Sequence, residues 1–376
     1  MDEELLDLYA DYLISSFRAT TATGLSTLLE GQVSHDQVTR FLAATPCTSA
    51  DLWRLVKPVV RQVQSPDGVL IVDDSIEEKP YTDENEIIAW HWDHSKERVV
   101  KGINFITVLY QVPQMALPVA FELVRKTQTV VDKKTGRSKR KSPTTKNEHA
   151  RAMLEQCVRN GLPFRYVLGD SWYASADNMK FIKHELGQHG QHGQHGQHGQ
   201  HGQHSQGYDF IMPLKRNRKV ALSRQEQRQD QYGAVETLKL EENAVRQVWL
   251  EGVDFPLLLV KQVFTNEDGS TGVLYLVSSD TTLTWQALTT LYQRRWKVEE
   301  YHKSLKQNAA LAKSPTRTVT TQTNHFFAAL YAYIKLERLK LKTTLNHFAL
   351  KTKIYLSALR TAFQELQTLQ GDRVPA

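Results

Sequence analysis

Short apolar runs between turn residues dominate the middle of the chain, whereas both ends carry apolar residues at helical spacing. Residues 69–72 follow the turn Pro66-Asp67-Gly68 and have the continuous apolar pattern of a buried strand. Further strands are predicted at residues 103–112, 117–124, 165–168 and 208–214, and helices at 147–160 and 175–186. This succession predicts an α/β fold in which helices flank a sheet.

The N-terminal residues 1–65 are predicted to be helical. Within them, residues 22–29, the turn Glu30-Gly31-Gln32 and residues 36–44, capped by Ser34, form a helix–turn–helix pattern. One interpretation is that the second helix presents Arg40 to DNA. The alternative is an ordinary helical hairpin. Helices are also predicted for residues 283–311 and 325–370.

Residues 220–280 are β-like, with strands predicted at 245–250, 255–264 and 273–277 and a hairpin turn at Asn266-Glu267-Asp268-Gly269. Residues 126–146 are polar and basic without periodicity, which predicts a loop. A second loop is predicted at residues 186–207, where Gly-Gln-His is repeated six times. Glycine at every third position is costly to order, so disorder is expected there. The alternative for this loop is a tract that binds transition metals.

Charge narrows the class of partner. The 376-residue chain has a formal net charge of +6, which favours an anionic partner. Basic residues cluster at 125–146, 215–219, 294–306 and 335–353, a distribution typical of a phosphate-binding surface; the alternative is solvated surface charge. Cys47 and Cys157 lie far apart, which argues against a disulfide framework or a thiolate zinc site. Without a signal pattern or a long apolar run, the sequence predicts a soluble cytoplasmic protein with no membrane partner.

The most informative pattern lies in the predicted helix 283–311. Counted from Tyr292, the residues Arg295, Glu299 and Lys306 follow at offsets of three, seven and fourteen. On an α-helix these offsets fall within a stripe about 60° wide, because each residue advances by about 100°. Glu300 lies about 80° from Tyr292 and about 100° from Glu299, off the stripe. A stripe in which the carboxylate of Glu299 lies between Arg295 and Lys306 favours contact with a polyanion that carries a metal ion.

Two further acidic positions follow predicted strands. Asp73 and Asp74 end the strand that starts at residue 69, and Asp170 ends the strand 165–168. Acids at the carboxyl ends of neighbouring strands meet at one edge of a sheet. Carboxylates are hard oxygen ligands that suit Mg²⁺ or Mn²⁺. Two such ions support in-line phosphoryl displacement. Because side chains alternate along a strand, one of Asp73 and Asp74 is expected to point into the site.

These residues resemble a known family. The spacing of Tyr292, Arg295, Glu299 and Lys306 fits the Y-x2-R-x3-E-x6-K motif of one class of bacterial insertion-sequence DDE transposases. Leu70-Ile71-Val72-Asp73-Asp74-Ser75 is similar to the first aspartate motif of that family, and Val167-Leu168-Gly169-Asp170-Ser171-Trp172-Tyr173 to the second. The resemblance covers roughly residues 65–330. It implies an RNase H-like mixed sheet flanked by helices, with a β-rich insertion and helical terminal regions.

The resemblance also implies roles for single residues. Asp74, Asp170 and Glu299 would hold two Mg²⁺ ions, for which Mn²⁺ can substitute. Asp74 is preferred because the family places a small hydroxyl residue after the first acid, as Ser75 does here; Asp73 is the alternative. The residues expected to bind DNA are Tyr292, Arg295, Lys306, Lys303, Trp249 and Arg40. Trp249 would stack on a flipped base, with an ordinary core tryptophan as the alternative.

The implied organisation has five regions. These are a DNA-binding region at 1–65, the first part of the catalytic core at 66–219, an insertion at 220–280, the last core helix at 281–330 and a C-terminal helical region at 331–376. His91-Trp92-Asp93-His94 looks like a ligand cluster but is interpreted as loop structure, because it falls between predicted strands without a partner cysteine or acid from another segment.

The leading hypothesis for function is cut-and-paste transposition. The enzyme would act on double-stranded DNA, at the inverted ends of its own element and at the target. A homodimer is expected in the DNA complex, in the cytoplasm of a bacterium and associated with its nucleoid. Two alternatives remain: an RNase H-like DNA nuclease, and a transposase-derived DNA-binding protein that has lost catalysis.

Overall fold

The computed structural model describes residues 2–371 except 95, 132–135, 137, 189–206 and 267. The chain forms two compact units, one made of Met1–Thr48 with Glu300–Ala376 and the other of Ser49–Glu299. These units differ from the five predicted regions, because residues 49–65 join the second unit and residues 300–330 join the first. Most of the Gly-Gln-His repeat lies outside the described residues.

The sheet of the second unit contains five neighbouring strands in the order β4-β3-β1-β7-β8. Their bounds are β1 Val69–Glu78, β3 Arg98–Val112, β4 Met115–Leu123, β7 Tyr166–Gly169 and β8 Asp209–Leu214. Strand β3 is antiparallel to β1 and β4, whereas β7 is parallel to β1 and β8. This mixed order confirms the predicted α/β, RNase H-like fold class.

Burial on both faces explains why the central strands are continuous apolar runs. Residues 69–72 of β1 are almost fully buried. Helix α4 (Ser49–Val63) packs on β4, α5 (Lys146–Arg159) on β3 and β4, and α8 (Trp285–Gln293) on β8. A sheet that is covered on both sides needs apolar residues at successive positions rather than at alternate ones. This pattern made the strands predictable.

The sequence did not predict strand β2 (Ile88–Asp93). This strand pairs with β3 at the edge of the sheet. The interpretation of His91-Trp92-Asp93-His94 as loop structure is therefore wrong for its first three residues, and His94 lies in the following turn. Ala89 and His91 point inward, whereas Trp90 and Trp92 are exposed. Such a half-exposed strand has no apolar run to reveal it.

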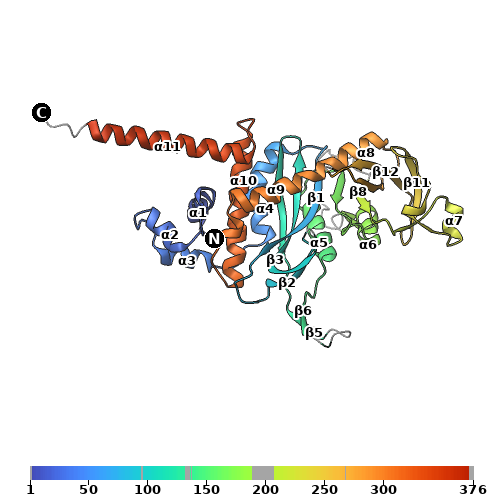
Figure 1. The fold of residues 1–376 in the computed structure, drawn as a ribbon, viewed down its shortest axis with the longest axis horizontal. Helices are drawn as coiled ribbons and strands as arrows, with labels where there is room; N and C mark the ends of the chain where they lie inside the picture. The colour runs from blue at the N-terminus through green and yellow to red at the C-terminus, as the bar shows by residue number, and fades with distance from the viewer. Residues whose placement is uncertain are drawn as a thin grey trace, which may run out of the picture. The chain divides into compact units, whose positions relative to one another are not determined.

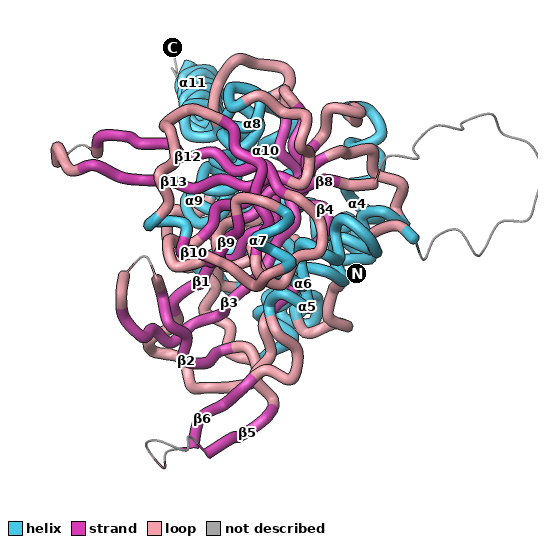
Figure 2. The backbone as a smooth tube through the Cα atoms, turned by 90° about the vertical axis from the view of Figure 1, so that its right-hand side faces the viewer, coloured by secondary structure: helices cyan, strands magenta, loops and turns pink. Residues whose placement is uncertain are grey.

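A second difference concerns residues 126–146, which were predicted to form a loop. They contain strands β5 (Gln128–Val131) and β6 (Ser138–Lys141), which pair with each other in a separate two-stranded sheet. Figures 1 and 2 show this basic hairpin projecting from the sheet. Its described residues are mostly exposed, so no apolar periodicity marks the strands.

The β-rich residues continue the main sheet, which extends from β8 in the order β13-β12-β11-β9-β10 (Figure 1). Their bounds are β9 Lys219–Ala221, β10 Gly233–Ala234, β11 Val245–Leu250, β12 Leu257–Thr265 and β13 Thr271–Ser278, with helix α7 at Arg224–Arg228. The three strands predicted for 245–277 are confirmed. The predicted turn joins β12 to β13, and Gly269 has a φ of 81° there.

The helix predicted for residues 283–311 is interrupted. Helix α8 ends at Gln293, a 3₁₀ turn covers Arg294–Trp296, and α9 runs from Lys297 to Asn308. The side chain of Arg294 donates to the backbone carbonyls of Asp67 at 2.8 Å and Gln111 at 2.9 Å, which ties this turn to the sheet. A 3₁₀ turn advances by about 120° per residue, so the 60° stripe calculated for one continuous helix is wrong.

Another helix also differs from its prediction. Residues 175–186 form α6 (Ala176–Lys180) followed by a π-helical turn at Phe181–Glu185. Cys47 and Cys157 are buried free cysteines, in agreement with the absence of a predicted disulfide. Within the described residues, no helix is long and apolar enough to cross a membrane.

The first unit is helical. It contains α1 (Glu3–Ser15), α2 (Ala22–Leu28), α3 (His35–Leu42), α10 (Val319–Lys340) and α11 (His347–Gly371). Helix α10 contacts α1, α3 and α11, and its buried polar residues are satisfied by hydrogen bonds. Asn324, for example, donates to the carbonyls of Leu42 and Ala44 and accepts from the backbone of Cys47.

The helix–turn–helix pattern has the predicted local structure. Ser34 caps α3 through a capping box, and the turn places Glu30 and Gly31 at positive φ. Arg40 is exposed on α3, where a role in DNA binding stays a prediction. Asp7 and Asp11, from the acidic N-terminus, form ion pairs with Lys335 of α10.

The close approach of β3 to β1 gives a test of the core sheet. A Cβ atom at Gly102 would overlap the backbone carbonyl of Glu77 on the paired strand. Gly102→Ala is therefore expected to lower the free energy of unfolding by about 1–3 kcal/mol, the usual cost of overpacking. Urea unfolding measures this loss. In the control Gly207→Ala, the added carbon would lie 3.4 Å from its nearest neighbour. Equal stability of the two variants would contradict the pairing of β1 with β3.

Candidate active site

The prediction that Asp73 and Asp74 end their strand is wrong, because β1 pairs with β3 as far as Glu78 and both acids lie in its middle. They project from opposite faces of β1, because side chains alternate along a strand. The Asp73 carboxylate lies 3.3 Å from the Arg295 guanidinium. The Asp74 carboxylate instead accepts from Lys146 Nζ, with both oxygens at 2.9 Å, and from the Tyr173 hydroxyl at 3.0 Å. Asn104 adds a further hydrogen bond of 3.2 Å. The two neighbouring acids therefore have different partners and different surroundings.

Asp170 directly follows β7. In the parallel pairing of β1 with β7, Val72 lies opposite Gly169, so the register brings Asp170 beside Asp73. The Asp170 carboxylate accepts from the backbone N–H groups of Trp172 at 2.8 Å and Tyr173 at 3.4 Å. These bonds hold the carboxylate at the end of the strand, as the sequence predicted.

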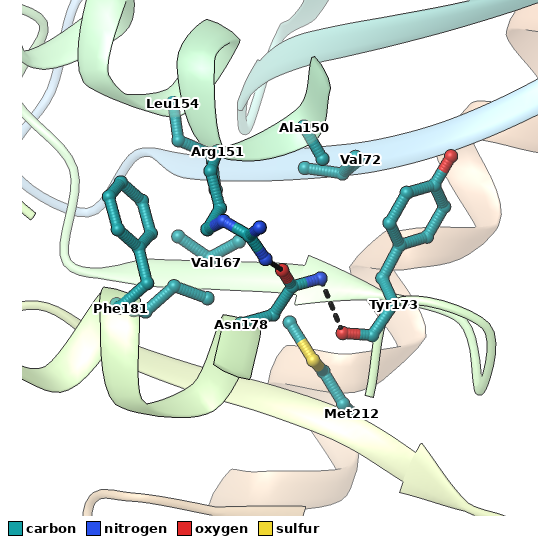
Figure 3. A pocket seen from close by; sticks show the side chains of 10 residues that line it. Val72, Ala150, Arg151, Leu154, Val167, Tyr173, Asn178, Phe181 and Met212 are labelled. Atoms are coloured by element: carbon teal, nitrogen blue, oxygen red, sulfur yellow. Dashed lines mark hydrogen bonds between the residues drawn. The ribbon is translucent and has the colours of Figure 1, made fainter. Parts of the chain in front are cut away.

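Polar contacts from α5 and α6 fix the loop after Asp170. Asn178 donates to the backbone carbonyl of Tyr173 at 3.0 Å and accepts from Arg151 at 2.7 Å. Figure 3 shows Asn178 between these two residues, in a pocket otherwise lined by apolar side chains such as Val167 and Met212. The loop thus rests on a packed and hydrogen-bonded support.

Arg295 links β1 to the segment that carries Glu299. One guanidinium nitrogen faces Asp73, and another lies 3.4 Å from the Glu299 carboxylate. The Tyr292 ring is half-buried, with its centre 5.9 Å from the guanidinium carbon. Three of the four motif residues therefore meet, although the helix is interrupted between them. The side chain of Glu299 remains 45% exposed, so it can reach a ligand in solvent.

Two acids of this cluster have raised pKa values. Burial, and then the negative charge of Asp170, raise the pKa of Asp73 well above its usual value, although Arg295 opposes this. Burial also raises the pKa of Asp170, and the Asp74 charge adds to the effect. Burial raises the pKa of Tyr292 to about 12. The buried Asp73 and the partly buried Asp170 therefore repel each other, and Arg295 offsets only part of this repulsion.

The donor set fits a divalent cation. Carboxylate oxygens are the preferred ligands of Mg²⁺, and a cation would relieve the repulsion that raises the pKa values of Asp73 and Asp170. Within the described residues, no group of three or more potential ligands already has the geometry of a metal site. The contact between Arg295 and Glu299 explains this in part, because a guanidinium occupies the space between carboxylates.

The remaining DNA-binding candidates belong to other elements. Trp249 lies on β11 opposite Ala221, and five pairings along the sheet order separate β11 from β1. Lys303 and Lys306 lie on α9 in the part that belongs to the first unit, and the ammonium of Lys303 lies 5.3 Å from the centre of the Phe348 ring. Their roles in binding DNA stay predictions.

Sequence reasoning missed the residues that surround Asp74. Lys146 begins α5 directly after the capping residue Thr145, and Tyr173 follows Asp170 by three positions. Lys146 was visible only as the last member of a basic segment. Tyr173 lay within the second motif, but nothing in the sequence indicated that its hydroxyl reaches β1.

An RNase H-like sheet with one acid in β1 and another at the end of the adjacent parallel strand β7 defines a class of metal-dependent nucleases and DNA-recombining enzymes. Residues 2–254 match the family described as DDE superfamily endonuclease, and the chain belongs to this family. The matched residues include Asp73, Asp74 and Asp170 and end before Glu299. No curated protein sequence matches the chain.

The raised pKa of Asp73 predicts a pH dependence of stability. A folded-state pKa above the unfolded value contributes stability at low pH, and this contribution is lost as pH rises through the folded pKa. We therefore expect the metal-free protein to lose stability as pH rises above about 4, the unperturbed pKa of aspartate. Asp73→Asn should reduce this loss, as measured by urea unfolding between acidic and neutral pH.

A matched control is Asp83→Asn, which removes an exposed carboxylate. It should leave the pH profile of the parent unchanged. Mg²⁺ should stabilise the parent more at neutral than at acidic pH, because the ion competes with protons for the carboxylates. If the stability of Asp73→Asn depends on pH in the same way as that of Asp83→Asn, the raised pKa of Asp73 is contradicted.

Proposed function

We propose that this DDE superfamily endonuclease is a transposase that cuts and joins DNA at the inverted ends of an insertion sequence. The observation that carries the proposal is the meeting of Asp73, Asp170, Arg295 and Glu299 where β7 ends beside the middle of β1. One acid comes from within β1, one from the end of β7 and the third from a distant helical segment, which is the order expected from the three sequence motifs.

We assign the first acid to Asp73 rather than to Asp74, which the sequence favoured. Asp73 shares Arg295 with Glu299, and its pKa responds to the charge of Asp170. Asp74 is engaged by both the Lys146 ammonium and the Tyr173 hydroxyl, so a metal would have to displace two partners. The support for this choice is electrostatic: Asp73 is still repelled by Asp170 despite its ion pair with Arg295, so it gains most from a cation.

Asp73, Asp170 and Glu299 would hold two Mg²⁺ or Mn²⁺ ions. When bound, such ions activate an attacking oxygen and stabilise the leaving oxygen of a phosphodiester. Arg295 would then exchange its carboxylate partners for a phosphate of the DNA, because a guanidinium forms strong paired bonds with phosphate oxygens. Tyr292 would pack beside that phosphate.

The chemistry of transposition needs two steps at the same residues. A water oxygen attacks the phosphorus at the element end, the bond to the leaving 3′ oxygen breaks, and that oxygen takes up a proton as a 3′-hydroxyl. This hydroxyl then attacks a phosphorus of the target strand and displaces another 3′ oxygen. The DNA partners are therefore the paired ends and the target, and the two ends favour a homodimer.

Substitution of the acids tests the assignment. Asp73→Asn, Asp170→Asn and Glu299→Gln should each reduce metal-dependent cleavage of an end-containing duplex by more than about 100-fold, the upper limit for loss of an outer-shell partner. Glu300→Gln, on the neighbouring residue, should retain cleavage. Asp74→Asn should also retain most of it. Loss of cleavage in Asp74→Asn together with activity in Asp73→Asn would reverse the assignment.

The products distinguish transposition from simple nuclease action. With a labelled end and a supercoiled target, we expect joined products in which the 3′ oxygen of the element end is bonded to a 5′ phosphate of the target. A duplex with a scrambled end should be cut poorly. Equal cleavage of both duplexes without joined products would instead identify a nuclease.

A further inference from the structure

Edge strand β2 and the loop after β7 expose large aromatic side chains. Trp90 is 51% exposed, Trp92 is 53% exposed and Trp172 is 41% exposed. Trp90 and Trp92 lie on the same face of β2, because they are two positions apart on a strand. Their neighbours Ala89 and His91 are buried. Core packing therefore does not explain why these indole rings face solvent.

The exposed rings form a row that reaches the acids. The Trp92 and His94 ring centres are 6.4 Å apart, and those of His94 and Trp172 are 5.5 Å apart. Trp172 follows Asp170 by two residues, and its backbone N–H donates to the Asp170 carboxylate. We call Trp92, His94 and Trp172 the aromatic row. It ends directly at one of the proposed metal ligands.

Cations accompany the row. The Lys146 ammonium lies 4.6 Å from the Trp172 ring centre, and the Lys215 ammonium lies 5.6 Å from it. Lys101 is placed similarly over Trp90, at 5.9 Å. Lys146 also bonds to Asp74, whereas Lys215 forms no ion pair within the described part of the chain. Aromatic faces bordered by ammonium groups suit a ligand with flat rings and negative charge.

Unpaired nucleotides have this chemistry. Each base presents a flat face for stacking, and each phosphate carries a negative charge that lysine can neutralise. In an intact duplex the bases already stack on each other and offer no free face. A protein partner would not require ammonium groups around the rings. The combination of exposed aromatic rings and ammonium groups therefore favours a DNA strand that is unpaired at the point where it passes the acids.

We propose that the aromatic row binds unpaired nucleotides of a DNA strand beside the proposed active site. The inference rests on the proposed function for the identity of the DNA, but its site differs from the one expected for Trp249. Bases stack on Trp172 and Trp92, and Lys215 contacts a phosphate of the same strand. The row thus holds single-stranded DNA that is exposed when an end is opened.

Binding of a fluorescent oligothymidine to the full chain without metal tests the proposal apart from cleavage. Trp172→Ala should weaken this binding by roughly 5- to 100-fold, the range expected for loss of one base–aromatic stack. Trp172→Phe should recover most of the affinity, because a flat ring remains. Trp92→Ala should also weaken binding. The unfolding midpoints of these variants should match that of the parent.

Trp296→Ala is the matched control, because it removes another exposed tryptophan, on the 3₁₀ turn. It should leave oligothymidine affinity unchanged. A loss in Trp296→Ala equal to the loss in Trp172→Ala would overturn the proposal. Weaker oligothymidine binding by Trp249→Ala, together with unchanged binding by Trp172→Ala, would also overturn the proposal. Base stacking would then be assigned to Trp249, as predicted from the sequence.

Salt dependence tests the part of Lys215. Lys215→Gln should reduce the slope of log affinity against log salt by about 0.7, the value for one phosphate contact on a single strand. An unchanged slope would show that Lys215 does not contact a phosphate of the bound strand. The two proposals can fail separately. Normal cleavage by the acid variants would overturn the proposed transposase activity. Normal oligothymidine binding by Trp172→Ala would overturn only the proposal that the aromatic row binds unpaired nucleotides.

Discussion

The contact of Arg295 with both Asp73 and Glu299 is the interaction on which the proposed site depends. It joins the central strand to a segment more than two hundred residues later in the sequence. The neighbouring Arg294 makes this possible, because its bonds to the carbonyls of Asp67 and Gln111 fasten the 3₁₀ turn to the sheet. One arginine therefore anchors the backbone, and the next connects the carboxylates.

The site that this contact joins has an electrostatic cost. Asp73 is buried, Asp170 is partly buried, and their charges repel each other, while Arg295 offsets only part of the repulsion. Folding tolerates this cost because the preceding residues 69–72 of β1 are apolar and almost fully buried. Perturbed pKa values of this kind are common at functional sites, although structural ion pairs also produce them. Membership of the DDE superfamily endonucleases favours the functional explanation here.

The sequence predicted those parts of the fold that burial controls. The central strands and α5 follow from continuous apolar runs and from a capping residue. Strand β2 and the β5–β6 hairpin did not, because their exposed positions carry charged or aromatic residues without a run. Alternation predicted that Asp73 and Asp74 would face apart, but not which face would receive Glu299. The face that receives Glu299 depends on how α8 and the 3₁₀ turn pack. Arg294 fixes the position of this turn through contacts with residues distant in sequence.

Alternation at β1 also connects the two proposals. Asp73 faces Arg295, whereas Asp74 faces Lys146, and Lys146 lies over the ring of Trp172. A strand seated on the aromatic row would bring its phosphates to the same ammonium group that now neutralises Asp74. Competition for Lys146 would leave Asp74 with less compensating charge, close to Asp170. Occupation of the row would therefore increase the need for cations at the acids, so that metal binding and strand opening favour each other.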